Sequence, residues 1–570
     1  MTQSSQAARG SDAGQIKETL ISVIIAFILA FVFRAFVIEA FIIPTGSMAP
    51  TLLGQHMRFQ DENTGYNWAV GPQFVIPGTS DPAPVQGSPQ NPVFVHDPMS
   101  REEIQRIGVP RQAGDRILVF KYLYSIYDPT RFDVVVFKAP HEPQQNYIKR
   151  LVGLPGEMIA LVDGDVFVRR PPQGETLPPG TDAWSLKGWQ IQRKDERTQR
   201  AVWQDVYSSE YKPLGQVRSV VGMQAGTRPF RSPWVGEGPA WKIEGRTEYE
   251  YDGAGPAVLA WDNQPTGTEQ QPFWPVNDYC WYNDTQNLNP QRAVFPMSDV
   301  NMRVGIAPKS APVDASAVIR ARGHEFRCDI KGTDVTLRMG RLGDTSKGMA
   351  AAAGPTEWKE LGRGKLPHAI EPGRVTNLEF WHVDQSLQLW NDGKLVVRGD
   401  YDWAPAERVL DTLGIDLPAM IANDARTPGQ NTLANERNYR QPVIRWEFTG
   451  GPVTLARVGL QRDLFYQPGN RRNPASGQYD TPARGTYPTA TMSLGPDHFF
   501  TCGDNSPSSL DARLWPAPDP WVAAEIDATE GVVPRQLMIG RAFFVYFPSL
   551  IKGKAAGLPV PDFGRMRWIW

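Results

Sequence analysis

FIIPTGSMAPTL, residues 41–52, follows directly after a long apolar segment and carries an isolated serine behind a glycine. Gly46 lets the chain turn tightly, so the hydroxyl of Ser47 is presented as a candidate nucleophile. A second stretch, YIKRLVGLPGE (residues 147–157), places Lys149 among apolar neighbours. A serine hydroxyl needs a base near neutral pH, and a lysine serves as one only when it is uncharged. The two stretches together predict a serine peptidase whose base is lysine.

Composition favours a globular, mainly β protein. The chain has 570 residues, enough for two or three domains, and its 52 glycines and 51 prolines favour strands, turns and loops over long helices. Its net charge of -2 gives no electrostatic reason to expect a nucleic acid partner. The three cysteines, Cys280, Cys328 and Cys502, are too few and too far apart for a zinc site. Cys280 and Cys328 are interpreted as buried residues, with a disulfide between them as the alternative, and we expect no metal or other cofactor.

The N-terminal segment predicts a membrane anchor. Residues 19–38 contain a single charge, Arg34, and are long enough to cross about 30 Å of hydrocarbon as a helix. The run continues into residues 41–44 without a small-residue exit site, which favours an uncleaved anchor over a signal peptide. We therefore expect a lipid bilayer as a partner, with residues 1–18 in the cytoplasm and the remainder exported.

Short β-branched and aromatic runs follow the anchor. Residues 115–122, 131–137, 147–152, 158–162 and 165–168 are typical of strands, and Asp163-Gly164 predicts a tight hairpin turn. The expected unit is an antiparallel catalytic sheet that begins in residues 39–170 and is interrupted by a surface excursion over 54–113. It resumes in residues 488–550, before a C-terminal tail over 551–570 that contacts the membrane interface, packs or frays.

Residues 171–487 change in character and predict an inserted β-sandwich-like domain. Apolar residues alternate over 326–330 and 335–339, and again over 378–382 and 387–389, around turns at Lys331-Gly332, Asp384-Gln385 and Asn391-Asp392-Gly393. The run 378–396 resembles a hairpin of concanavalin-like or laminin-G-like sandwich modules. This resemblance implies a possible protein or glycan contact by the insertion, and a purely structural insertion is the alternative.

The ordered motifs of the chain resemble those of bacterial type I signal peptidases. The resemblance rests on residues 44–52, 114–116, 133–137, 147–157, 503–513 and 531–542, in that order and behind an anchor. Phe132, Thr45, Ala512 and Pro516 depart from the usual family pattern, but none of them replaces a catalytic group. The resemblance implies a serine endopeptidase of the bacterial cytoplasmic membrane that removes signal peptides from exported preproteins.

The same resemblance assigns roles to individual residues. Ser47 and Lys149 would be the catalytic pair, and the Ser47 N–H with the Thr45 hydroxyl would form the oxyanion hole. Ser509 would orient Lys149, supported by Gly503, Asp504, Asp511 and Arg513. Pockets for small substrate side chains would be lined by Phe41, Ile43, Pro44, Met48, Leu52, Tyr147 and Ile148.

Two other functions are open at this stage. One is a self-cleaving repressor-type Ser-Lys peptidase, against which the predicted anchor argues. The other is a membrane-tethered binding protein with vestigial peptidase motifs, against which the joint presence of Ser47, Lys149 and Ser509 argues. A histidine-based triad is not supported, because the seven histidines are scattered.

Overall fold

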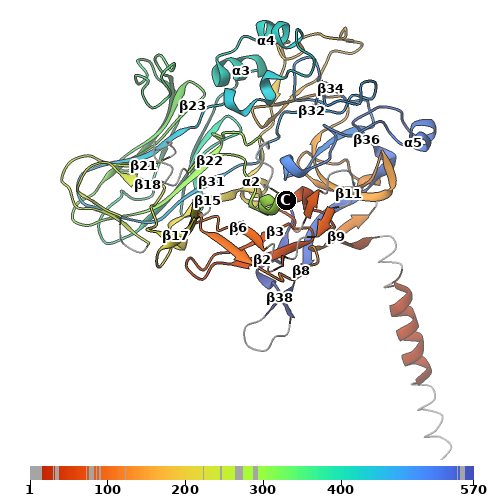
Figure 1. Ribbon diagram of the computed structural model, residues 1–570, viewed down its shortest axis with the longest axis horizontal. Coiled ribbons are helices and arrows are strands. Elements are labelled where there is room, and N and C mark those ends of the chain that lie inside the picture. The colour runs from red at the N-terminus through yellow and green to blue at the C-terminus, as the bar shows by residue number, and fades with distance from the viewer. Residues whose placement is uncertain are drawn as a thin grey trace, which may run out of the picture.

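The computed structural model describes residues 16–29, 31, 37–71, 73–75, 82–84, 87–88, 92–121, 123–221, 224–243, 247–262, 274–286, 293–548, 550–552 and 559–570. Within them the chain is mainly β, as the sequence predicts, and every strand pairing is antiparallel. Figure 1 shows a sandwich on one side of the body and the sheets that carry the N-terminal strands on the other.

The sheet that follows the N-terminal helix combines strands from both ends of the chain. Its order is β1-β9-β37-β10-β11-β35-β36, with β40 paired to β37. Its strands are β1 (Ile38–Ile42), β9 (Arg116–Lys121), β10 (Val134–Ala139), β11 (Glu142–Gly153), β35 (His498–Cys502), β36 (Val533–Pro534), β37 (Met538–Phe547) and β40 (Arg567–Trp568). A neighbouring sheet holds the predicted Asp163-Gly164 hairpin in β12 (Met158–Val162) and β13 (Asp165–Arg169), flanked by β14 (Gln190–Ile191) and β34 (Met492–Ser493).

The insertion forms two large sheets around a shared core. One sheet contains β15 (Gln204–Ser208), β19 (Trp241–Lys242), β20 (Tyr249–Tyr251), β22 (Val300–Pro308), β27 (Thr376–Val383), β28 (Ser386–Asn391), β29 (Lys394–Asp400) and β31 (Val453–Arg462). The other contains β18 (Trp234–Gly236), β21 (Ala257–Trp261), β23 (Asp314–Ala321), β24 (His324–Lys331), β25 (Asp334–Arg341), β26 (Lys359–Lys365) and β30 (Val443–Thr449). Side chains of both sheets, such as Phe326, Trp446, Phe380 and Leu389, meet in one buried cluster.

This cluster confirms the period-two patterns of the insertion. The predicted faces, residues 326, 328 and 330 and residues 335, 337 and 339, all lie in it. The predicted turns close hairpins: Val383 pairs with Ser386, and Asn391 pairs with Lys394. Asp384, Gln385 and Asp392 adopt positive φ there, the backbone that tight hairpin turns require.

Residues 54–113, expected as a surface excursion, contain paired strands in the parts that the structure describes. These are β2 (His56–Gln60), β3 (Asn67–Val70), β4 (Gln73–Val75), β5 (Pro82–Pro84), β6 (Val93–His96), β7 (Glu103–Arg106) and β8 (Arg111–Gln112). Met57, Trp68, Val95 and Ile104 share a small buried core. The excursion is therefore a packed lobe, because its few apolar residues alternate despite the many turn residues around them.

The remaining elements are short. They are the two-stranded pairs β16 (Val217–Val221) with β17 (Gln224–Arg228), β32 (Asn470–Arg471) with β33 (Thr481–Pro482), and β38 (Leu550–Lys552) with β39 (Pro559–Pro561). The helices are α2 (Glu196–Val202), α3 (Pro405–Leu413), α4 (Leu417–Asp424) and α5 (Pro520–Glu525). The 3-10 turns are η1 (Gly46–Met48), η2 (Leu123–Ser125), η3 (Ser209–Tyr211), η4 (Trp281–Gln286), η5 (Thr432–Ala434), η6 (Glu436–Asn438), η7 (Ser506–Ser508), η8 (Arg535–Leu537) and η9 (Phe563–Arg565).

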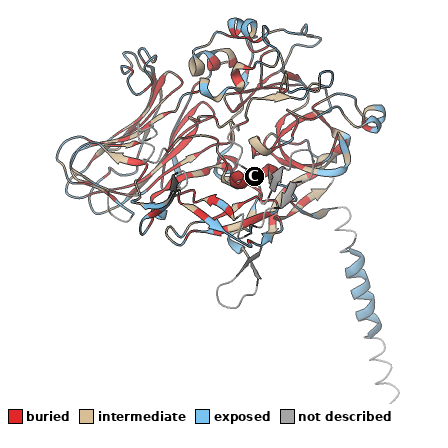
Figure 2. Cartoon of the chain, in the orientation of Figure 1, coloured by how far each residue is buried: buried red, intermediate tan, exposed pale blue. Residues whose placement is uncertain are grey.

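The N-terminal helix projects from the body. Residues 16–29 are helical and exposed, as Figure 2 shows, whereas buried residues concentrate in the sheets. Among the residues that the structure describes, no helix is long and apolar enough to cross a membrane. The predicted span over 19–38 is thus not confirmed, and its residues 30 and 32–36 lie outside the described part of the chain.

The C-terminal tail packs. Strand β40 pairs with β37, Ile569 is buried in the hydrophobic cluster of the same sheet, and a main-chain oxygen of Trp570 accepts a hydrogen bond from Arg150. All three cysteines are buried and free, in agreement with the interpretation as buried residues.

Candidate active site

Ser47 lies in the 3-10 turn η1, directly after the edge strand β1. The residue is only 7% exposed. Gly46 is required by close packing, because a Cβ at this position would come 2.0 Å from the ring of Tyr282. The nucleophile loop, residues 46–53, therefore rests on a side chain that the insertion supplies.

Lys149 lies on β11, between β10 and β35. Its Nζ is 2.6 Å from Ser47 Oγ, so the two predicted groups are in hydrogen-bond contact. The lysine is 3% exposed, and its Nζ lies 5.4 Å from the centroid of the Tyr147 ring on the same strand face. The contact joins residues 102 positions apart because β1 and β11 belong to the same sheet.

Burial lowers the pKa of Lys149 from 10.5 to about 8. The loss of hydration disfavours the charged amine and is the largest cause. Asp511 opposes this shift, since a nearby carboxylate favours the ammonium, while Arg513 adds to it. A large share of the lysine is therefore neutral at pH 8, which is the state a general base requires.

Two buried ion pairs form the wall around the lysine. Asp511 binds Arg513 at 2.7 Å and accepts a hydrogen bond of 3.0 Å from the Gly503 N–H. Asp504 binds Arg150 through two hydrogen bonds of 2.7 and 2.8 Å. Both pairs are hydrogen-bonded on several sides, the condition under which buried charges are tolerated.

Ser509 lies beside this wall without contacting Lys149 by a hydrogen bond. Its Oγ is buried and has no hydrogen-bond partner within the described part of the chain. A Cβ on Gly503 would meet Ser509 Oγ at 2.3 Å and the Ser47 carbonyl oxygen at 2.5 Å, so only glycine fits between them. The expected bond from Ser509 to Lys149 is thus not formed in this structure, although the serine is close to the nucleophile loop.

The predicted pocket residues do not all lie in one cluster. Ile43, Met48, Leu52 and Ile148 are buried in one hydrophobic cluster, against which Phe41 packs. Pro44 and Thr45 are exposed, and Tyr147 packs against a different cluster. The pocket and the oxyanion hole remain predictions, since substrate contacts are needed to define them.

The sequence did not predict the residues that form hydrogen bonds to the main chain of the nucleophile loop. The Asn505 N–H donates to the Ser47 carbonyl oxygen at 3.0 Å, and Asn505 Nδ2 donates to the Gly46 carbonyl oxygen at 2.9 Å. The Asn505 amide also exchanges hydrogen bonds of 2.7 and 2.9 Å with Asn283. Asn505 stands in a polar turn that signals a site, whereas nothing in the sequence around Asn283 marks it.

Outside the active site, one cluster of buried carboxylates is arranged closely enough to bind a cation. Carboxylate oxygens of Asp165, Asp299, Asp384 and Asp463 come within 4.8 Å of one another. Cationic side chains already lie among them: Lys194 binds Asp384 and Asp463 at 2.7 and 2.9 Å. Arg322 and Arg408 bind Asp163, Asp165 and Asp299. The cluster is therefore an ion-pair network between the Asp163-Gly164 hairpin and the insertion.

A buried serine lies within hydrogen-bond distance of a buried lysine, the geometry that activation of a hydroxyl by a base requires. Comparison with known proteins bears on the same part of the chain. Residues 16–83 and 110–215, which include Ser47 and Lys149, match the family "Signal peptidase, peptidase S26". This part of the chain is thus similar to signal peptidases of the S26 family.

Curated relatives point to the same family. "Signal peptidase I" of Rickettsia bellii is 27% identical over 147 residues, which are 26% of this chain and 37% of the relative. "Signal peptidase I" of Pseudomonas aeruginosa is 47% identical over 60 residues, 8% of this chain and 21% of the relative. The chain thus spans well under half the length of these relatives.

Among solved structures, "carbohydrate binding module CBM66 from Bacillus subtilis" is 10% identical, with a TM-score of 0.21. The match covers 40% of this chain and 95% of that chain.

Proposed function

We propose that this chain is a membrane-anchored serine endopeptidase that removes N-terminal signal peptides from exported preproteins through a Ser47-Lys149 dyad. The observation that carries the proposal is the distance of 2.6 Å between Ser47 Oγ and the Nζ of a buried lysine. Its support is chemical as well as geometric, because burial brings the pKa of this lysine to about 8.

In the proposed mechanism, neutral Lys149 takes the proton from Ser47 as the serine oxygen attacks the scissile carbonyl carbon. An acyl-enzyme forms, and the lysine returns its proton to the leaving amine. The same amine then deprotonates the water that hydrolyses the ester. The Ser47 N–H and the Thr45 hydroxyl would stabilise the oxyanion, a contribution whose loss typically lowers the rate by about 10² to 10³.

Specificity for small side chains before the cut is part of the proposal. Ile43, Met48, Leu52 and Ile148 are tightly packed beside Ser47, with Met48 and Leu52 fully buried. A bulky substrate side chain would have to displace this core, whereas alanine would not.

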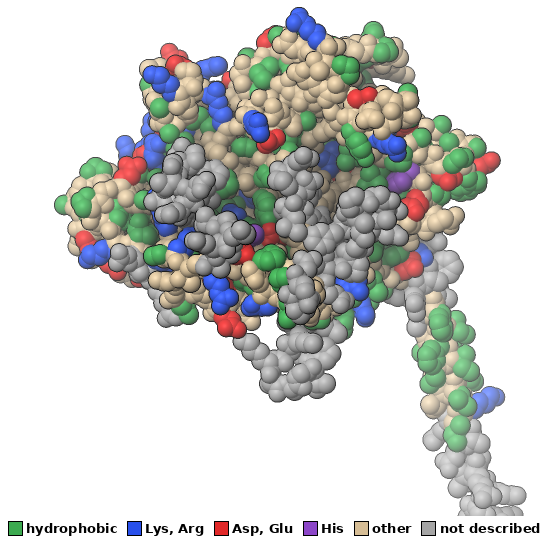
Figure 3. All heavy atoms as spheres, viewed as in Figure 1, with side chains coloured by type: hydrophobic (Ala, Val, Ile, Leu, Met, Phe, Trp, Pro, Cys, Tyr) green, Lys and Arg blue, Asp and Glu red, His purple; other side chains and the backbone are tan. Residues whose placement is uncertain are grey.

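The anchor is proposed from the N-terminal apolar segment. Large apolar residues between Ile16 and Phe31 are 45–65% exposed, and Figure 3 shows hydrophobic side chains along the projecting helix. Such surface is unfavourable in water and suited to lipid. We place the N-terminus in the cytoplasm and the catalytic unit outside the bacterial cytoplasmic membrane. Tethering raises the enzyme concentration where preproteins emerge.

The test is preprotein processing by purified variants in detergent. Ser47→Ala and Lys149→Ala are expected to abolish cleavage while circular dichroism shows an intact fold. Matched controls are Ser493→Ala and Lys138→Ala, which change exposed residues on neighbouring strands and should cleave at the wild-type rate. Normal processing by either dyad variant would refute the proposal.

A further inference from the structure

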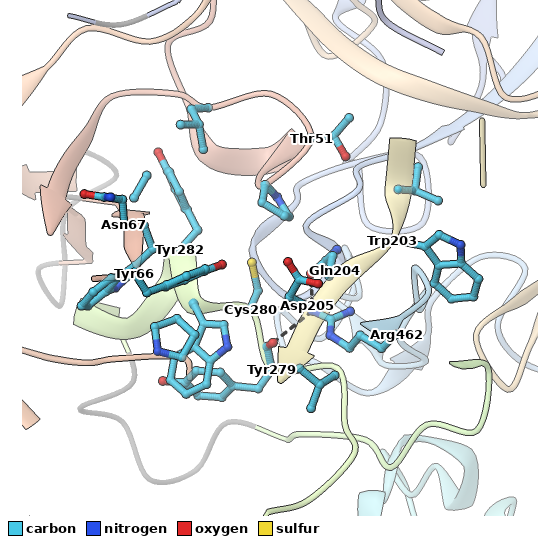
Figure 4. A pocket seen from close by; sticks show the side chains of 18 of the residues that line it. Thr51, Tyr66, Asn67, Trp203, Gln204, Asp205, Tyr279, Cys280, Tyr282 and Arg462 are labelled. Carbon is cyan, nitrogen blue, oxygen red and sulfur yellow. Dashed lines mark hydrogen bonds between the residues drawn. The ribbon is translucent and has the colours of Figure 1, made fainter. Parts of the chain in front are cut away.

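A cavity of about 380 Å³ lies behind the nucleophile loop, on the side of the insertion. Pro50, Thr51 and Leu53 form one wall, and the others come from β3, β15 and residues 275–282. Figure 4 shows Tyr66 and Tyr282 on one side of it, with Gln204, Asp205 and Arg462 on the other. Its volume falls in the range of small-ligand sites, about 300 to 1,000 Å³.

Arg101 supplies a cation to this cavity, and the carboxylates of Asp97 and Asp284 act on it only from beyond ion-pair distance. Its guanidinium lies 4.3 Å from the ring centroid of Trp281 and 5.0 Å from that of Trp274. No ion pair joins it to a described residue, and its buried Nε has no hydrogen-bond partner there. A guanidinium held on aromatic faces presents its fork in a fixed orientation, which suits a carboxylate or phosphate.

The other arginines of the cavity are engaged. Arg58 binds Asp562 at 2.8 Å, and Arg565 binds Asp115 at 3.0 Å. Arg462 donates to the side chain of Gln204 and to the Tyr279 carbonyl oxygen. Arg101 is therefore the group of this cavity best placed to receive an external anion.

Aromatic rings and planar polar groups make up much of the remaining lining. Tyr66 and Trp68 stack with centroids 6.2 Å apart, and Tyr279 and Trp281 meet edge to face at 4.7 Å. Asn67 adds an exposed amide, and the buried Trp68 Nε1 has no partner among described residues. Gln204 and Asp205 also line the cavity, with the Gln204 oxygen bound by Arg462 and Asp205 paired with Arg303 at 3.2 Å. Aromatic faces accept the C–H faces of sugar rings, while planar polar side chains bind hydroxyl groups in pairs.

We propose that this cavity binds a carboxylate-bearing saccharide of about two sugar units, with the carboxylate on Arg101 and the sugar rings against the aromatic lining. The proposal is independent of the peptidase function. A saccharide fits better than an acidic peptide, because the cavity offers side-chain groups and rings where a peptide needs a partner for its backbone.

The experiment is calorimetric titration of the full chain in detergent at low ionic strength, with digalacturonate as the probe. Cellobiose serves as the neutral disaccharide, and an acetylated Asp-Ala-Asp amide serves as the acidic peptide. We expect digalacturonate to bind at least 10-fold tighter than either. Arg101→Met, which keeps the apolar stem, should lose this advantage. The matched control Arg106→Met changes an exposed arginine of β7 and should bind like the wild type.

A second variant tests the proposal if Arg101→Met does not fold. Asn67 is exposed, so Asn67→Ala should fold normally and weaken binding several-fold. The proposal is overturned if the wild type does not bind digalacturonate, if neither variant weakens binding, or if the peptide binds as tightly as the saccharide.

Discussion

At the scale of single residues, the site depends on an amine kept out of water. Among the described residues no carboxylate contacts Lys149 directly, and its buried hydrogen bond goes to a neutral hydroxyl. Its pKa is lowered mainly because burial removes the hydration of the charged amine. The buried lysine therefore destabilises the folded chain at pH values at which the lysine of the unfolded chain is charged.

Replacing Lys149 with methionine should therefore stabilise the protein while abolishing activity. The unfolded lysine binds its proton up to about pH 10.5 and the folded one only to about 8, so its unfavourable contribution grows as pH falls through this window. At pH 7 the gain is at most about 3 kcal/mol, from about 1.4 kcal/mol per pKa unit. Urea unfolding at pH 7 and pH 10 measures it. The gain should shrink at pH 10, and an unstable variant at both pH values would contradict the assignment.

At the scale of elements, the nucleophile loop is held between two turns. Asn505, which precedes turn η7, binds the loop from the peptidase side. From the insertion, the Tyr282 ring of η4 packs against Gly46, and Asn283 of η4 hydrogen-bonds the Asn505 amide. The insertion is therefore in direct contact with the loop that carries Ser47.

Breaking the amide pair should lower turnover through the position of Ser47. Asn505→Ala keeps the main-chain bond to Ser47 but removes the side-chain donor to the Gly46 carbonyl oxygen and leaves the buried Asn283 amide without its partner. Such a loss typically costs about 1–3 kcal/mol and predicts a 10- to 100-fold lower kcat. Asn283→Ala should lower kcat about 10-fold with little change in KM. The double variant should be no slower than Asn505→Ala, because both act through one network. Asn435→Ala, an exposed asparagine of the insertion, is the control. Fully additive losses would show that the two residues act separately.

The hairpins and turns show how much of the fold could be predicted from the sequence. Period-two patterns and Asp-Gly or Asn-Asp-Gly turns predicted the hairpins at residues 163–164 and 391–393, because local register and turn geometry are encoded by neighbouring residues. Motifs predicted Ser47 and Lys149. Asn283 could not be predicted, since its role arises from a contact with a residue 222 positions away in a turn without sequence signature. The packed lobe in residues 54–113 was obscured by its glycines and prolines.

At the scale of the whole molecule, a buried ion network joins the peptidase hairpin to the insertion. Arg408 lies fully buried and binds Asp163 at 3.0 Å and Asp165 at 2.6 Å. Removing one partner leaves carboxylates uncompensated in the interior, which typically costs about 3–5 kcal/mol. Arg408→Met should therefore lower the free energy of unfolding by about that amount in urea melts. Arg363→Met, on an exposed strand, should change it by less than about 0.5 kcal/mol.

We also propose that the N-terminal segment places the protein at the membrane and does not contribute to peptide-bond cleavage. Deletion of residues 1–36 leaves β1 and Ser47 in place. The truncated chain should cleave a soluble peptide at a rate within about 2-fold of the full chain and fail to sediment with membranes. Membrane association of the truncated chain at the full-chain level would contradict the proposed anchor.

The most direct test of the Ser47-Lys149 account is the pH dependence of kcat/KM on a short signal-peptide substrate. If the neutral amine is the base, kcat/KM should rise about 10-fold per pH unit below an apparent pKa of about 8 and level off above it. The account would be contradicted if kcat/KM stayed constant from pH 6 to 9. It would also be contradicted if the Lys149→Ala variant showed the same rise of kcat/KM with pH.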